Sequence, residues 1–400
     1  MNENPADLAP ELCVLAAAVL GLVYGMFLPR ARQRRVAVVC AAGLAAGLAA
    51  SGAAAAGADL MAFGSFAVDP ITHVTRIAVL GSTLPVVVLA AGRVRGHPRE
   101  SEHYVLILLS ALGTMVLGAS ADLLVVVAAY LLASLPAYAL AGFGKDAAGT
   151  EAALKYYLMG ALLGVLMLGG VTLLSGVGRG TAYPVLRAGL AEAPPAAVAA
   201  GLVALLAGLL FKAGAVPGHF WVPDVTEGAP PGRRRLRHDR PEDRRAGRPL
   251  PVRSRGPAGR RPVLLAVVAA ATMTLGNLAA FAQDNVRRLL AYSTVAQAGY
   301  LLVPVAMADR SDLAQPALLY YLGAYAVTNV GAFAVVLATG RDDLGGYAGL
   351  MRGSPSSACP SSSASSGSSA RRRAPCSSGR SSCSARPSTA DTSGSPRSRP

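Results

Sequence analysis

The sequence predicts an all-α fold, a polytopic bundle of transmembrane helices in which one helix is broken near Pro217. Hydrophobic residues make up 53% of the chain, and its apolar runs repeatedly exceed roughly 18 residues, the length that a membrane-spanning helix needs. Lipid offers no hydrogen-bond partner to backbone groups, so apolar runs of this length form helices. The Pro217-Gly218 pair interrupts one of them.

The predicted spans, in order, cover residues 11–28, 36–57, 75–92, 104–119, 121–142, 153–176, 196–222, 263–282, 286–308 and 316–339. They divide the chain into transmembrane helices within 1–230, an Arg-rich insert at 231–262, further transmembrane helices within 263–352, and a Ser/Arg-rich disordered tail at 353–400. Membrane spans therefore account for both long segments, and the insert and the tail need separate explanations.

The net charge of +15 comes from these two unusual segments. Residues 231–262 hold twelve Arg and three acids, and residues 353–400 hold seven Arg and one Asp, so the rest of the chain is neutral. A strongly basic protein often binds nucleic acid, but the neutral membrane part argues against such a partner. We expect no nucleic-acid binding.

Arginine clusters orient the helices, because cytoplasmic loops of membrane proteins are rich in Lys and Arg. Arg30–Arg35 after the first span places the N-terminus outside the cell and leaves that span as a retained helix. Two more crossings return Arg93–Arg99 to the cytoplasm. Arg287 and Arg288 then emerge outside unless another crossing lies between 225 and 262, where twelve arginines oppose insertion.

The amino-acid composition of the insert is typical of GC-rich codons translated in the wrong reading frame. Asp239–Arg244 requires codons GAY CGN CCN GAR GAY CGN, apart from rarer arginine codons. Read one base later, these give Thr or Ile, then Val, Ala, Gly or Asp, then Leu, Pro, Gln or Arg, then Lys or Arg, then Thr or Ile. We predict a frameshifted helix with a second buried lysine, restored near Pro262, and a second frameshift in the tail. The alternative is a genuine basic loop and a disordered basic tail.

Lys212 is the main candidate for function. It lies about 24 Å along an apolar helix from Ala196. An ammonium there costs roughly 2.5–3.5 kcal/mol on insertion scales and indicates function by default. The alternative is a lysine that extends to the interface, but its side chain would have to pass Pro217 and His219.

Three further side chains are candidates for a proton pathway. Glu151 and Lys155 stand four residues apart at a helix start, where they form either a surface ion pair or a proton relay. His219 follows the Pro217 break, where freed backbone groups line a polar cavity. A lone histidine is alternatively a structural residue.

Four acids are expected to have structural roles. Asp69 and Asp122 stand at the starts of spans, where acids favour helix N-termini. Asp224 and Glu227 flank a turn, where a capping or turn role is expected.

Signatures of nucleotide, flavin, iron–sulfur and zinc sites are missing from the sequence. It has no P-loop, dinucleotide fingerprint, His-Glu-x-x-His or Cys-x-x-Cys motif. We expect no metal and no cofactor bound by this chain. The composition favours an ion- or proton-conducting membrane subunit.

Several strings resemble one family. Residues 211–224 read FKAGAVPGHFWVPD, and residues 227–230 read EGAP. They closely resemble the signature of subunit N of proton-translocating NADH:quinone oxidoreductase, bacterial respiratory complex I. The positions that carry it are Pro217, Trp221, Pro223, Asp224 and Glu227. Supporting strings are SLP at 134–136, EAALKYY at 151–157, NVRRLLAYST at 285–294, QAGY at 297–300 and NVGAF at 329–333.

The resemblance implies an antiporter-like subunit of the complex I membrane arm, where an acid and lysines on neighbouring helices relay protons. Lys212 matches the broken-helix lysine, and Lys155 matches a lysine of the preceding helix. The next lysine would fall in the insert. NADH, FMN, iron–sulfur clusters and quinone are implied for the whole complex. The implied partners are the other membrane subunits and the lipid bilayer, in the bacterial plasma membrane.

The chain also departs from the family pattern. Leu131 stands where the family usually carries a buried glutamate, and Gln297 stands where related chains often have His. The family continues with further helices past residue 353, so the product resembles a damaged or truncated copy. The leading alternative is a subunit of a multisubunit cation/proton antiporter, and the second is a non-functional pseudogene product.

Overall fold

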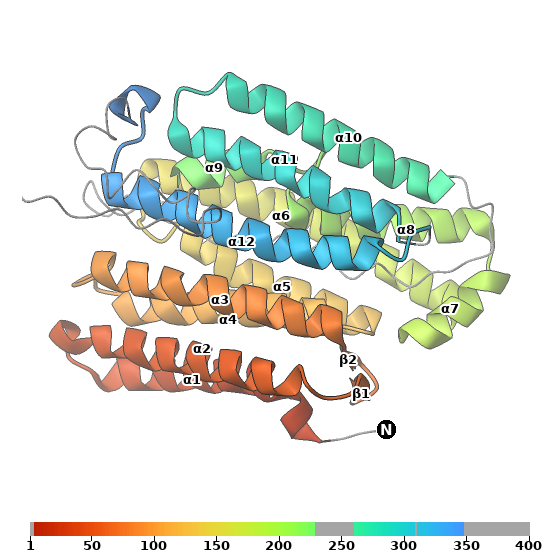
Figure 1. The fold of residues 1–400 in the computed structure, drawn as a ribbon, viewed down its shortest axis with the longest axis horizontal. Coiled ribbons are helices and arrows are strands. Elements are labelled where there is room, and N and C mark those ends of the chain that lie inside the picture. Colours follow the sequence, from red (N-terminus) through yellow and green to blue (C-terminus); the bar gives the residue numbers. More distant parts are fainter. Residues whose placement is uncertain (1–3, 229–259, 309, 348–400) are drawn as a thin grey trace, which may run out of the picture. The chain divides into compact units, whose positions relative to one another are not determined.

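A computed structural model describes residues 4–228, 260–308 and 310–347 (Figure 1). All described helices belong to one unit. The long helices are α1 (Ala9–Phe27), α2 (Arg34–Ala54), α3 (Pro70–Arg93), α4 (Glu100–Ala119), α5 (Leu123–Ala141), α6 (Ala147–Gly178), α8 (Pro195–Ala213), α10 (Arg260–Phe281), α11 (Val286–Ala306) and α12 (Ala314–Thr339). Shorter elements are α7 (Tyr183–Glu192), α9 (Trp221–Gly228), β1 (Leu60–Ala62), β2 (Phe66–Val68), η1 (Pro5–Leu8), η2 (Arg30–Arg32) and η3 (Leu344–Tyr347).

Ten of the described helices are long and apolar enough to cross a membrane. They confirm the predicted all-α bundle, and most of their bounds follow the predicted spans within a few residues. The span predicted at 196–222 is divided into α8 and α9 around Pro217, so the predicted broken helix is confirmed. The tail at 353–400 and the insert up to residue 259 lie outside the described residues.

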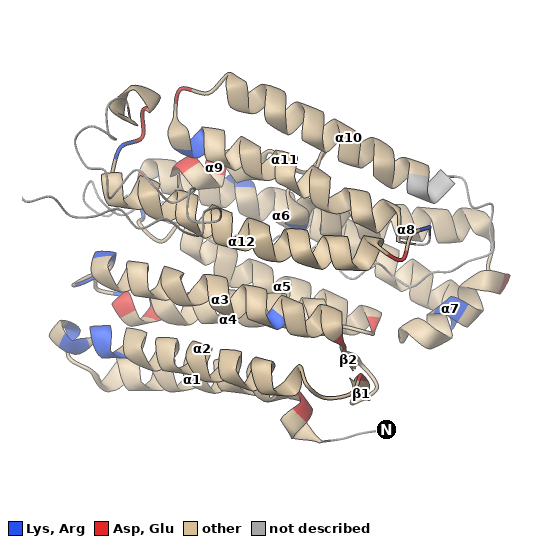
Figure 2. Cartoon of the chain, viewed as in Figure 1, with Lys and Arg blue, Asp and Glu red and all other residues tan. Residues whose placement is uncertain are grey.

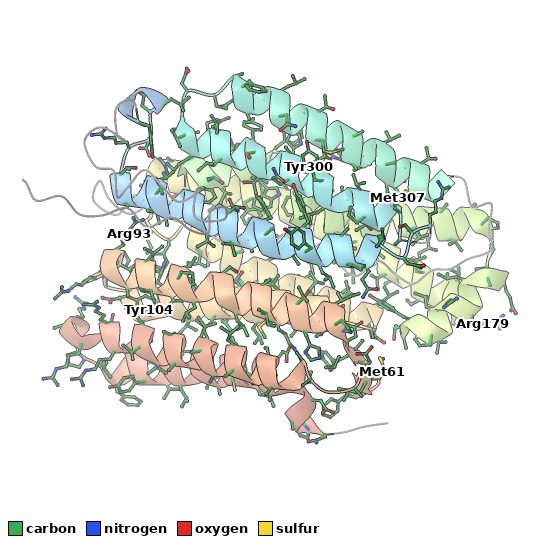
Figure 3. All side chains as sticks on the ribbon, in the orientation of Figure 1. Met61, Arg93, Tyr104, Arg179, Tyr300 and Met307 are labelled. Carbon is green, nitrogen blue, oxygen red and sulfur yellow. The ribbon has the colours of Figure 1, made fainter. Side chains whose placement is uncertain are left out.

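One end of the bundle, which we call the hairpin rim, is built from the β1–β2 hairpin and the loops beside Ala121 and Thr181. The Ala121 amide donates to the Ser65 carbonyl at 2.8 Å, and the Leu123 amide donates to the Thr181 carbonyl at 3.0 Å. Figure 3 shows Met61 at this end. These backbone bonds join the hairpin, the start of α5 and the α6–α7 connection.

The opposite end is the arginine rim, where Lys and Arg gather at the ends of α2, α3 and α11 (Figure 2). Figure 3 shows Arg93 at this end. Arg99 donates to the Phe143 carbonyl at 3.0 Å, which joins the start of α4 to the end of α5. Arg288 of α11 contacts Glu227 of α9 at 2.7 Å. Cationic side chains therefore gather at this rim, as at the cytoplasmic side of membrane proteins.

Helices α8 and α9 pack along α6 as one interrupted crossing. Glycines give the close approach that membrane helices use, and the contact pairs are Gly201 with Leu174, Gly208 with Met167, Phe211 with Gly160, and Gly228 with Ala152. The α6 partners run backwards as α8 and α9 run forwards, so the packing is antiparallel. Gly160 stands roughly 20 Å from the start of α6 and 27 Å from its end. Lys212, next to Phe211, therefore lies near the middle of the bundle.

Helices α10 and α11 form an antiparallel pair in which Gly276 packs against Ala296. Since α11 begins at the arginine rim, α10 ends there and begins at the hairpin rim (Figure 1). Helix α9 also ends at the arginine rim. Gly228 and Arg260 therefore lie at opposite ends of the bundle, and the 22 residues of α10 set the separation at roughly 30 Å.

The structural roles expected for two acids are confirmed. Asp69 accepts from the Thr72 amide at 2.9 Å at the start of α3, and Asp122 accepts from the Leu124 amide at 2.7 Å at the start of α5. Helix α7 and the hairpin were not predicted, because both are short and lie between the apolar runs from which spans are read.

Candidate functional site

Lys212 lies in the last turn of α8, where a left-handed glycine ends the helix. Gly214 has φ +67°, and the Ala215 amide donates to the Leu210 carbonyl at 2.9 Å, a pattern that closes many helices. The last carbonyls of a helix carry partial negative charge. This helix end therefore offsets part of the cost of an ammonium held within the membrane.

Helix α5 supplies the groups that contact the Lys212 ammonium. Nζ donates to the Ala133 carbonyl and to Ser134 Oγ, each at 3.2 Å. Pro136 lies inside α5 and has no N–H, so the backbone ladder is interrupted next to these residues. Ser110 of α4 also donates to the Ala133 carbonyl, at 3.1 Å. Ala133 and Ser134, the first residue of the Ser-Leu-Pro string, thus form one wall of the lysine site.

The turn between α8 and α9 rests on α10 and α11. The Val216 amide donates to Thr272 Oγ1 at 3.2 Å, and Ala215 packs in a cluster with Leu302. His219 is buried in this turn, and its Nδ1 finds no hydrogen-bond partner among the described residues. The break therefore places a lysine and a buried imidazole within a few residues of each other.

Trp221 closes the break. Its indole Nε1 donates to the Phe211 carbonyl at 3.0 Å, and its ring stacks on Tyr156 of α6 with centroids 4.1 Å apart. Pro223 lies in the first turn of α9, where a missing N–H costs nothing because that amide has no partner within the helix. These motif residues fix the geometry of the two half-helices.

The predicted pair of Glu151 and Lys155 lies at the arginine rim. Lys155 Nζ contacts Glu151 at 2.8 Å and Asp224 of α9 at 3.4 Å. Lys155 and Glu151 are more than half exposed. Asp224 also lies 3.6 Å from Arg288, which contacts Glu227 at 2.7 Å. Asp224 and Glu227 thus lie within α9 and join it to α6 and α11, beyond the turn role expected from the sequence.

Arg287 is fully buried at the same rim. It contacts Asp342 Oδ1 at 3.0 Å and donates to the Glu227 carbonyl at 3.2 Å and to the Thr226 carbonyl at 3.5 Å. A cation at a helix C-terminus complements the partial charge there. Arg287 therefore holds the end of α9 against the segment that follows α12.

We expect Arg287→Ala to lower the stability of the protein by about 2–3 kcal/mol, because it removes the buried guanidinium that contacts the α9 carbonyls and Asp342. Arg288→Ala is the matched control. It removes a partly exposed ion pair and should cost less than about 1 kcal/mol. Titration with a denaturing detergent measures both, and equal losses would contradict the role assigned to Arg287.

The two departures from the family pattern lie on α5 and α11. Leu131 stands one turn before Ser134 on α5 and is half exposed. Gln297 accepts a hydrogen bond from the Tyr321 hydroxyl of α12. Within the described ranges, no group of three His, Cys, Asp or Glu side chains is arranged to hold a metal ion.

Comparison with known proteins places this site in a family. A family profile described as "NADH:quinone oxidoreductase/Mrp antiporter, TM" matches residues 120–232 and 259–358. NADH-quinone oxidoreductase subunit N 1 of Streptomyces griseus is 48% identical over 358 residues, which cover 89% of this chain and 76% of that protein. Subunit N of Mycobacterium sp. strain JLS is 46% identical, with 88% and 76% covered.

The chain belongs to the NADH-quinone oxidoreductase subunit N family. A solved structure of respiratory complex I from Thermus thermophilus contains a chain that is 31% identical, with a TM-score of 0.69 and coverage of 86% of this chain and 75% of that one. The Mrp complex from Dietzia matches with a TM-score of 0.64 at 23% identity, over 84% of this chain and 64% of that chain. That likeness shows the shared fold alone.

Two buried charged residues outside the subunit N signature were not predicted from the sequence. Arg76 of α3 is fully buried, and its Nε and Nη2 contact the Glu11 carboxylate of α1 at 2.7 and 2.8 Å. Both residues stand at the starts of predicted spans. A charge inside an apolar span is the signal that would have identified them.

Proposed function

We propose that this chain is a membrane-arm subunit of a proton-translocating NADH:quinone oxidoreductase, in which Lys212 carries protons. NADH, FMN, iron–sulfur clusters and quinone belong to other parts of the complex, and this chain holds no redox group. The observation that supports this proposal most directly is an ammonium near the middle of the bundle, at a helix break, in a chain of the subunit N family. The chain is a multi-pass protein of the bacterial plasma membrane with its N-terminus outside.

Three features of the site support proton transfer at Lys212. The α8 carbonyls, the Ala133 carbonyl and Ser134 Oγ stabilise the charged form. A lysine amine changes protonation readily when its surroundings change. The break leaves polar backbone groups within the membrane, where continuous helices would offer none.

We place the cytoplasmic entry of this pathway at the arginine rim. Lys155, Glu151 and Asp224 form an exposed cluster there. On α6, Lys155 precedes Gly160 by five residues, a rise of roughly 8 Å, and Gly160 is the α6 contact of Phe211 beside Lys212. His219 is the proposed second proton carrier at the break, because it is buried there and an imidazole can both accept and donate a proton.

A tagged full-length chain, purified from detergent-solubilised membranes, tests membership of the complex. We expect it to copurify with flavin and iron–sulfur subunits and with NADH:quinone oxidoreductase activity. Copurification with small antiporter subunits would support the cation/proton antiporter alternative. Recovery of the chain alone, without activity, would support a non-functional product.

We further propose that a crossing helix is missing from the sequence between α9 and α10. Gly228 and Arg260 lie at opposite ends of the bundle, and the proposed helix would connect these two ends across the membrane. The intervening residues hold ten of the insert's arginines, which oppose crossing. The family match is also interrupted between residues 232 and 259. These observations support a frameshift over the insert, and the Ser/Arg composition supports another in the tail.

Independent sequencing of the chromosomal gene across codons 228–264 is expected to reveal a single-base shift upstream of codon 239 and a compensating shift near codon 262. The intact mass of the expressed protein should then differ from 40.5 kDa. A gene that encodes these residues without error, together with a matching mass, would end this proposal while leaving the family assignment intact.

A further inference from the structure

Tyr138 lies between the lysine site and the arginine rim. It follows Ser134 by four residues on α5, so the two side chains share one face of that helix about 6 Å apart. Its ring meets Tyr156 edge-on with centroids 4.5 Å apart, and it meets Tyr157 at 5.8 Å. Tyr157 stands two residues after Lys155.

A glycine on α6 makes room for this phenol. A β-carbon at Gly160 would overlap the Tyr138 hydroxyl and would lie 2.7 Å from Cζ of the same ring. It would also lie 3.1 Å from the ring of Phe211, the residue before Lys212. The Tyr130 hydroxyl donates to the Gly160 carbonyl at 3.4 Å. Gly160 is therefore the point on α6 where α5 and the lysine end of α8 meet.

We propose that Tyr138 is a relay residue that passes protons between Lys212 and the Lys155 cluster. The inference rests on the proposed function, because it adds a step to the pathway assigned there. Along α5 the Ser134 hydroxyl contacts the Lys212 ammonium, and the Tyr138 hydroxyl lies against Gly160, the α6 contact of Phe211 beside Lys212. Across to α6 its ring contacts the residues that directly follow Lys155.

In this transfer the Tyr138 phenol oxygen gains one proton for each proton that it loses. When Lys212 is a neutral amine, Tyr138 Oη accepts a proton released by the Lys155 ammonium as its own proton passes through Ser134 Oγ to Lys212 Nζ. The O–H bond on one side breaks as the other forms, so the side chain ends as a neutral phenol and no co-reactant is needed. Rotation of the hydroxyl then resets it for the next proton.

Tyr138→Phe tests the relay, because it keeps the ring contacts and removes only the hydroxyl. In inverted membrane vesicles that contain the complex with the full chain, we expect NADH-driven proton uptake to fall about tenfold. NADH oxidation by an artificial electron acceptor should stay within about twofold, which shows that the complex is assembled. The proton count per NADH is the readout, since a purely structural role would lower both rates together.

Two matched controls separate the relay from packing. Tyr104→Phe removes another buried tyrosine hydroxyl, which donates to Glu100 at 2.9 Å on α4, among helices α1–α4 (Figure 3), and should leave the proton count unchanged. Gly160→Ala should displace the Tyr138 phenol and reduce the count. Gly164→Ala, one turn away on α6, meets its nearest atom at 3.3 Å and should not.

The outcomes also separate the two proposals. Loss of proton uptake in Lys212→Ala but not in Tyr138→Phe would overturn the relay and leave the proposed function standing. Unchanged proton uptake in both variants would overturn both. Equal losses in Tyr138→Phe and Tyr104→Phe would assign the effect to packing and reject the relay.

Discussion

Replacing Lys212 by alanine is expected to reduce NADH-driven proton uptake at least about tenfold, because general acid–base groups typically contribute a hundredfold or more to proton transfer. The ammonium is the cationic group that α5 holds at the helix break, through the Ala133 carbonyl and Ser134. NADH oxidation by an artificial acceptor should persist, since the redox groups belong to other subunits. Proton uptake by inverted vesicles measures the change.

Two further variants identify what Lys212 contributes. Lys212→Arg keeps the positive charge but cannot release its proton in a protein, so it should fail to restore uptake. Lys145→Ala removes an exposed lysine from the loop before α6 and should leave uptake unchanged. Normal uptake in Lys212→Arg would show that charge alone suffices and would remove proton transfer from the role of this residue.

Replacing Arg76 by leucine is expected to destabilise the protein by about 3–5 kcal/mol, because it removes one member of a buried ion pair. The Arg76 side chain is 0% exposed and that of Glu11 is 7% exposed. The pair joins α1 to α3 near the hairpin rim, and Arg76 also donates to the Asp7 carbonyl at 3.2 Å. The midpoint of a denaturing-detergent titration measures the loss.

The double replacement of Arg76 and Glu11 by leucine should recover most of this stability, since it removes both charges at once. Arg187→Leu provides a matched control, because Arg187 lies on the exposed side of α7. A double variant that is as unstable as Arg76→Leu would show that the ion pair itself stabilises the contact between α1 and α3, and that the loss does not come from one charge left in apolar surroundings.

Local sequence rules predicted the bundle because each span satisfies its own backbone hydrogen bonds in lipid. The positions of the spans follow from apolar length alone, and the break follows from Pro217 and Gly218. The two N-terminal caps, Asp69 and Asp122, were likewise local features. These elements depend on interactions within a few residues, which a sequence displays directly.

The sequence alone gives only a range for the depth of Lys212 within the membrane. It follows from the register of α8 and α9 on α6, set by glycines such as Gly160 and Gly208 that contact residues far away in the chain. The same holds for Arg287, whose partners come from α9 and from the segment after α12. The register between distant helices and the pairing of buried charges produce no periodic pattern in the sequence.

We propose that the intact chain crosses the membrane between α9 and α10 and that Lys212 lies within the bundle that this crossing completes. Single cysteines tested with a membrane-impermeant thiol reagent address it most directly, after replacement of the five native cysteines. Thr150 and Asp284 mark the arginine rim, and Val263 and Asp312 mark the hairpin rim; all four are exposed.

We predict that cysteines at 150 and 284 react only from the cytoplasmic side and that those at 263 and 312 react only from the outside. Reaction of residues 150 and 263 from the same side would contradict the missing crossing and the position that it gives to Lys212.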